Sequence, residues 1–147
     1  MSSTAFAAVL AVAAGLGGAV QIAVQGRLGG RVGSFEAVTT AAVVGCAFAL
    51  AILVARRSLA GVGEALAGPK WQLVGGIMSV FIVLAVTVAG PRIGVVATTA
   101  LIVAAQFGLA ALIDRYGWLG VERVPVTWPR VVGIVLLAIG AALTLRR

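Results

Sequence analysis

Residues 71–113 read WQLVGGIMSVFIVLAVTVA, GPR and IGVVATTALIVAAQFGLAALI, and they contain a single charged residue, Arg92. Each of the two long runs holds about 20 mostly apolar residues, the length that an α-helix needs to cross the hydrocarbon core of a bilayer. The short break at 90–92 predicts a tight turn that makes the two helices antiparallel neighbours. This segment therefore predicts a protein that lies in a membrane.

The composition extends this prediction to the whole chain. Hydrophobic residues make up 62% of the 147 residues, charged residues make up 10%, and the mean hydropathy is +1.18. A soluble domain carries roughly a quarter charged residues. Together with 71–89 and 93–113, three more apolar runs at 4–24, 36–55 and 131–145 make a set of five. We expect an all-α integral membrane protein, with residues 1–147 forming a single domain of five transmembrane helices.

The links between these runs differ in character. Residues 25–34 (QGRLGGRVGS) form a basic, glycine-rich link, and residues 114–130 form the longest loop. In the 56–70 link, apolar residues recur at helical spacing, which favours a short interfacial helix and a plain linker about equally.

Basic residues are divided almost evenly between the two sides of the membrane. The side of the N-terminus carries six, namely Arg56, Arg57, Lys70, Arg115, Arg123 and Arg130, and the opposite side carries five, namely Arg27, Arg31, Arg92, Arg146 and Arg147. The positive-inside rule fixes an orientation only where such residues are asymmetric. The balance therefore favours dual topology, in which copies insert both ways round. The alternative is one dominant orientation, set by a weak bias.

Dual topology in turn predicts an assembly. Two oppositely inserted copies can pair about an axis in the membrane plane, and five spans per copy would give ten helices with an inverted repeat. Many secondary transporters build that architecture within one chain. We therefore expect each copy to be half of a ten-helix antiparallel homodimer.

Several short motifs resemble one known family. They are Gln21 to Leu28 (QIAVQGRL), Gly75-Gly76, Pro91-Arg92-Ile93-Gly94, Gln106, residues 113–120 (IDRYGWLG), Arg130-Val131-Val132-Gly133 and Gly140. In this order they are similar to the YdcZ-type inner-membrane exporters of the drug/metabolite transporter superfamily, over essentially the whole chain. The resemblance implies a multi-pass half-transporter of the cell (inner) membrane. Family members occur as dual-topology homodimers, as oppositely oriented pairs and as fused ten-helix chains.

Four polar side chains are candidates for substrate binding: Gln21, Thr99 and Gln106 inside the spans, and Gln25 just beyond the first span, near the headgroups. Gln106 lies about 5 Å along the helix axis from the middle of its span. An amide has donors and an acceptor, so it can orient a neutral polar solute without a buried charge. The alternative is that these amides bond neighbouring helices. The family resemblance leads us to expect asparagine at position 25, and Gln25 reaches one methylene further.

Two carboxylates near helix ends are candidates for a gate or for coupling. Glu36 lies at the start of a span, where the helix dipole favours a negative charge, so capping is its alternative role. Asp114 lies at the end of a span, where the dipole disfavours it, so we expect compensation by an arginine or by backbone N–H groups. Hydroxyls at Thr39, Thr40, Ser79, Thr87 and Thr98 are expected to bond the backbone carbonyls four residues earlier.

These features predict a secondary transporter or exporter of a small polar solute or metabolite, working by alternating access. Its partners are then the solute, the lipid bilayer and a second, antiparallel copy. The alternative is a passive channel or a structural membrane subunit. The sequence carries no visible catalytic set, phosphate loop or metal cluster. We therefore expect no enzymatic activity, no cofactor, no metal and no nucleic-acid partner.

Overall fold

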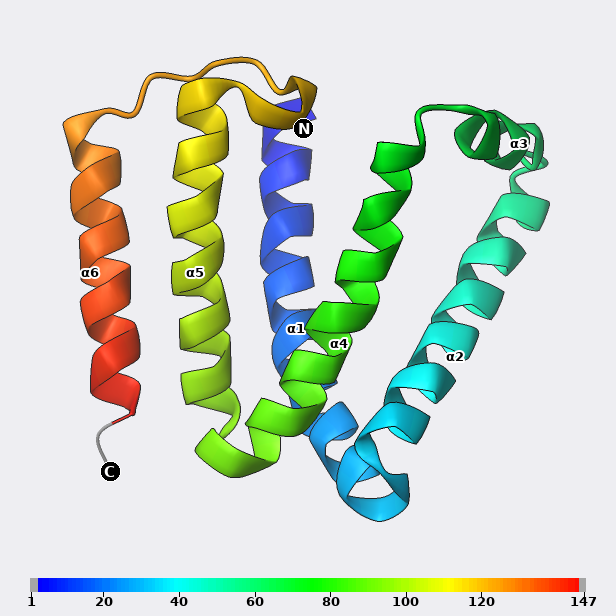
Figure 1. Cartoon of the computed structure of the whole chain (residues 1–147), viewed down its shortest axis with the longest axis horizontal. Coiled ribbons are helices and arrows are strands. Elements are labelled where there is room, and N and C mark those ends of the chain that lie inside the picture. The colour runs from blue at the N-terminus through cyan, green and yellow to red at the C-terminus, as the bar shows by residue number, and fades with distance from the viewer. Residues whose placement is uncertain (1–2, 146–147) are drawn as a thin grey trace. The chain divides into compact units, whose positions relative to one another are not determined.

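The computed structural model of the chain describes residues 3–145, which form helices joined by short links (Figure 1). Four helical stretches are long and apolar enough to cross a membrane, and the helix at 128–144 is shorter. The all-α membrane class is thereby confirmed, while the count of five crossings stays a prediction. The elements are α1 (Ser3–Val32), α2 (Ser34–Ala55), α3 (Ala60–Ala67), η1 (Lys70–Leu73), α4 (Val74–Ile93), α5 (Val95–Tyr116), η2 (Trp118–Gly120) and α6 (Trp128–Thr144).

The chain groups into two compact units. The first comprises Met1–Ile22 and Ile93–Arg147, and the second comprises Ala23–Arg92. In the first unit α5 and α6 pack side by side in opposite directions (Figure 1). The second unit contains the end of α1 together with α2, α3, η1 and α4.

The link predicted at 25–34 is wrong, because α1 continues as a helix to Val32. Glycine lowers helix stability by about 1 kcal/mol per residue relative to alanine, which is why the segment resembles a loop. Two glycines of this segment lie where α1 approaches α4 closely. A Cβ added to Gly26 would lie 3.0 Å from Pro91 Cδ, and one added to Gly29 would lie 2.5 Å from Thr87 Cγ2. The turn itself is confined to Gly33, whose φ of 104° suits glycine.

The tight turn predicted at 90–92 is also displaced. Pro91 lies inside the last turn of α4, which ends at Ile93, and Gly94, with a φ of 87°, separates α4 from α5. A proline this close to the end of a helix costs little more than one backbone hydrogen bond. Arg92 caps the same turn, because its Nη1 donates to the carbonyl of Val88 at 3.0 Å.

The remaining links are more ordered than predicted. The 114–130 loop is shorter than expected, since α5 continues to Tyr116 and α6 begins at Trp128. Gly117 ends α5 in the left-handed conformation that commonly terminates helices. In the 56–70 link the structure supports the helical alternative, with α3 at Ala60–Ala67.

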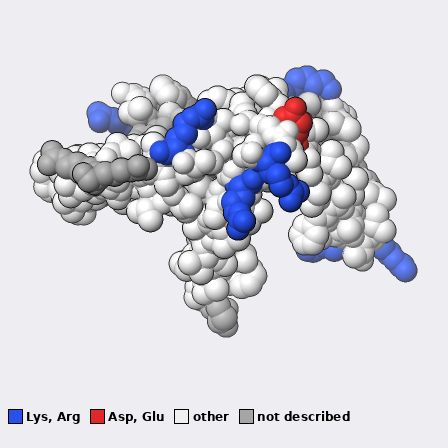
Figure 2. All heavy atoms as spheres, turned by 90° about the horizontal axis from the view of Figure 1, so that it is seen from below, with Lys and Arg blue, Asp and Glu red and all other residues white. Residues whose placement is uncertain are grey.

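Most apolar side chains of the single chain are left uncovered. In the most apolar part of each long helix only 6–11% of the residues are buried. On the face shown in Figure 2, charged side chains form a few separate groups on an otherwise uncharged surface. Exposing this much apolar area to water is unfavourable in free energy, so lipid or further protein must cover it.

Candidate functional site

An ion pair joins the facing ends of α5 and α6 in the first unit. Asp114 is near the end of α5 and Arg130 is in the first turn of α6, and Arg130 Nη1 donates to Asp114 Oδ2 at 3.2 Å. The Asp114 side chain is 31% exposed, and that of Arg130 is 49% exposed. The arginine supplies the compensation that a carboxylate needs at a helix C-terminus. The predicted need is thus met by Arg130, sixteen residues further along the chain.

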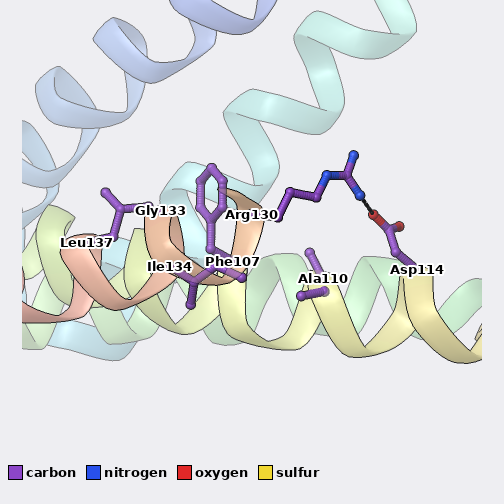
Figure 3. A pocket seen from close by; sticks show the side chains of 8 residues that line it. Phe107, Ala110, Asp114, Arg130, Gly133, Ile134 and Leu137 are labelled. Atoms are coloured by element: carbon purple, nitrogen blue, oxygen red, sulfur yellow. Dashed lines mark hydrogen bonds and ion pairs between the residues drawn. The ribbon is translucent and has the colours of Figure 1, made fainter. Parts of the chain in front are cut away.

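A cavity of about 270 Å³ lies beside this ion pair, between α5 and α6. Figure 3 shows Arg130 reaching toward Asp114 at one end, while Phe107, Ile134 and Leu137 line the other. On each helix the lining extends seven residues from the charged one, which is about 10 Å at 1.5 Å per residue. The cavity therefore has a charged mouth and an apolar interior. The full lining is Phe107, Ala110, Ala111, Asp114, Arg130, Gly133, Ile134 and Leu137.

A buried amide is the most unusual polar group of the second unit. Gln25 is 5% exposed, and its Nε2 has no hydrogen-bond partner within the part of the chain that the structure describes. It lies on α1 next to Gly26, which packs against Pro91 of α4. Buried polar groups are nearly always paired, and an unpaired one costs about 1–3 kcal/mol. Gln25 is therefore a position where a partner is missing.

The other three substrate-binding candidates lie in the first unit and are separate from one another. Gln21 is exposed on α1, one helical turn before Gln25, and Gln106 is exposed on α5. Thr99 is half-buried, and its hydroxyl donates to the carbonyl of Val95 at 2.8 Å. Within the described part of this unit, no hydrogen bond joins any two of the three. Gln106 also does not line the cavity, although its neighbour Phe107 does.

Glu36 is the third residue of α2 and is exposed. Its carboxylate lies against Gly33, the residue that precedes the helix, in the space that a Cβ on that glycine would occupy. A carboxylate in the first turn interacts favourably with the helix dipole. This placement is compatible with the capping alternative. Among residues 3–145 no ion pair involves Glu36, so its gating role stays a prediction.

The predicted local hydroxyl bonds are confirmed in all five cases. The distances lie between 2.6 and 3.0 Å, and the acceptors are the carbonyls of Phe35, Glu36, Gly75, Val83 and Gly94. Each hydroxyl therefore satisfies its own helix. These five hydrogens are not available to a solute in this structure.

Two features of the site were not predicted from the sequence. One is the cavity between α5 and α6, and the other is the packing of α1 against α4 around Gln25. A signal for the first was present, since an aspartate and an arginine stand at the two ends of one link. No local signal marked the second, because it depends on contact between helices distant in sequence.

A family model described as "Putative inner membrane exporter, YdcZ" matches residues 6–143. The chain belongs to this family. The match runs from the first turns of α1 almost to the end of α6, so the YdcZ resemblance seen in the motifs is confirmed. With the long apolar helices it places the protein in the inner membrane. The chain matched no curated protein and no solved structure.

Proposed function

We propose that this member of the YdcZ family is half of a secondary exporter for a small polar solute or metabolite, working by alternating access as a dual-topology antiparallel homodimer. The match of the family model over residues 6–143 is the observation that carries the export function. The substrate class and the assembly are inferred from this chain's own residues.

The placement of basic residues supports dual topology. In the second unit Gly26 of α1 packs against Pro91 of α4, so Arg27 and Arg92 belong to the same end of that unit, as the charge count assumed. Arg146 and Arg147, which that count also uses, lie outside the described residues. With six basic residues on one side of the membrane and five on the other, the positive-inside rule favours neither orientation strongly.

A stripe of small residues on α6 supports an antiparallel pair. Gly133 and Gly140 lie on one face of the helix, three residues before and four residues after the middle of Trp128–Thr144. A Cβ added to either would meet nothing within 4 Å, although Gly133 also lines the cavity between α5 and α6. Two copies of α6 crossing in opposite directions would set Gly133 of one copy near Gly140 of the other. Small residues at such positions let membrane helices approach closely.

The ion pair supports a gating role for Asp114. Within residues 3–145 a single contact, from Arg130 Nη1 to Asp114 Oδ2, holds the pair, and both side chains are partly exposed at the mouth of the cavity. A pair that solvent reaches contributes about 0–1 kcal/mol, so it can open and close at little cost. Glu36 remains the second gating or coupling candidate. It lies in the first turn of α2, at the end of that helix farther from α3.

Flux measured in proteoliposomes tests the export function. Purified protein is reconstituted, and a panel of neutral, zwitterionic and charged metabolites is screened with and without proton and sodium gradients. We expect concentrative movement of at least one small polar solute when a gradient is present. Protein-free liposomes are the control. Movement that only equalises the solute, whatever the gradient, would instead indicate a passive channel.

A further inference from the structure

The unpaired amide of Gln25 is buried on α1, within about one turn of the two glycines that contact α4. Successive helical residues are rotated by about 100°, so Gln25, Gly26 and Gly29 share an arc of roughly 100°. Gly26 faces Pro91 and Gly29 faces Thr87, both on α4. Gln25 therefore borders the face of α1 that packs on α4. Its Nε2 is a buried donor without an acceptor there.

The other side of the crossing offers an acceptor without its usual donor. Pro91 has no N–H, so the carbonyl of Thr87, four residues earlier in α4, loses the hydrogen bond that a helix normally supplies. That carbonyl oxygen lies 3.8 Å from the position of a Cβ on Gly29. The Thr87 hydroxyl already donates to the carbonyl of Val83 at 2.6 Å, and the residue is 2% exposed. A buried donor on α1 and a buried carbonyl on α4 thus belong to the two helices of one crossing.

We propose that this α1–α4 crossing, formed by Gln25, Gly26 and Gly29 with Thr87 and Pro91, is a closed gate over a solute contact. When the helices separate, Gln25 Nε2 donates to an acceptor of the solute and the Thr87 carbonyl accepts from a donor of the solute. The pair selects a solute that carries a carbonyl oxygen beside an N–H, as a carboxamide or a urea does. This inference rests on the proposed export function and narrows its substrate class.

The glycines explain how the gate closes and how it can be held open. A Cβ on Gly29 would stand 2.5 Å from Thr87 Cγ2, closer than real Cβ contacts, so Gly29→Ala forces the helices apart. Gly30 is the next residue of the same helix, and a Cβ there meets nothing within 4 Å. Gly30→Ala is therefore a matched control with the same change in helix propensity.

Thiol labelling measures the opening without any need for transport. Cys46, which is exposed, is first replaced by serine, and Val86→Cys places a thiol beside Thr87 at a position that is 5% exposed. A water-soluble maleimide is then added to the protein in liposomes. We expect labelling at least tenfold faster with Gly29→Ala than with Gly30→Ala. Equal rates in these two variants would overturn the gate.

Protection from labelling tests the solute class on the opened variant. Benzamide has the carbonyl and the N–H, whereas acetophenone has nearly the same shape and only the carbonyl. We expect benzamide to protect the Val86→Cys thiol at concentrations at least tenfold lower than acetophenone. Gln25→Leu removes the donor to the carbonyl that both compounds share, so it should weaken protection by both while the difference set by the Thr87 carbonyl remains. Gln25→Asn should weaken protection by both compounds less than Gln25→Leu does. Equal protection by both compounds, or none by either, would overturn the solute assignment.

The two proposals can fail separately. A gate that opens and binds benzamide in a protein that exports nothing would contradict the export function alone. An exporter whose Gly29→Ala and Gly30→Ala variants label at the same rate would contradict the gate alone.

Discussion

Three lysines added to the link between α2 and α4 are expected to convert a mixed population of orientations into a single one. Ser58, Gly61 and Gly63 are suitable positions because all three are exposed, and a Cβ on either glycine meets nothing within 4 Å. Replacing them with lysine raises the basic count on that side from six to nine, against five on the other. The positive-inside rule then holds this link in the cytoplasm.

Reporters fused to the C-terminus measure the effect. One reporter is active only inside the cytoplasm and the other only outside, and the unmodified chain should give signal with both. With the three lysines, five crossings place the C-terminus outside, and the ratio of the two signals should change at least tenfold. The same three positions changed to glutamine are the uncharged control and should leave the ratio unaltered. A signal from the unmodified chain in one compartment only would refute dual topology.

Gln106→Leu is expected to weaken substrate binding about ten- to hundredfold. Gln106 is exposed on α5 in the single copy and lies near the middle of its helix, where the equivalent groups of an antiparallel pair converge. Leucine roughly keeps the volume and removes the hydrogen bonds. A polar group left unpaired in a buried site costs about 1–3 kcal/mol, which corresponds to that loss of affinity.

Affinity and thermal stability must be measured on one Gln106→Leu preparation, using the solute that the flux screen identifies. A substrate contact predicts lower affinity with a nearly unchanged melting temperature. If Gln106 instead bonds a neighbouring helix, the melting temperature falls and the affinity of the folded protein is preserved. The second result would remove Gln106 from the site.

The sequence predicted those parts of the fold that depend on local chemistry. Runs of about 20 apolar residues have few alternatives to membrane helices, and a hydroxyl in a helix finds its carbonyl within one turn. Helix ends were predicted less well, because the residues 26–32 and 90–93 contain glycine or proline and resemble loops. In the structure this part of α1 approaches α4 closely at Gly29 and Thr87, and a pattern within one segment cannot show such a contact.

The candidate site was predictable only where charge imposed a requirement. Asp114 at a helix C-terminus needed a counter-charge, but several arginines could have supplied it, and only the packing of α5 on α6 selects Arg130. Gln25 was predicted near the headgroups, and the structure places it among the buried residues. The role predicted for Gln106 depends on a second copy, so one chain cannot fix it.

Cross-linking between two copies of α6 tests the antiparallel homodimer most directly. In a Cys46→Ser background, one tagged copy carries Gly133→Cys and a differently tagged copy carries Gly140→Cys, and the two are co-expressed and treated with a short bifunctional maleimide. The two glycines lie almost equally far from the middle of α6, so an antiparallel pair places unlike positions together. We therefore predict cross-links mainly between copies with different tags. Cross-links mainly between copies with the same tag would show a parallel pair and contradict the account.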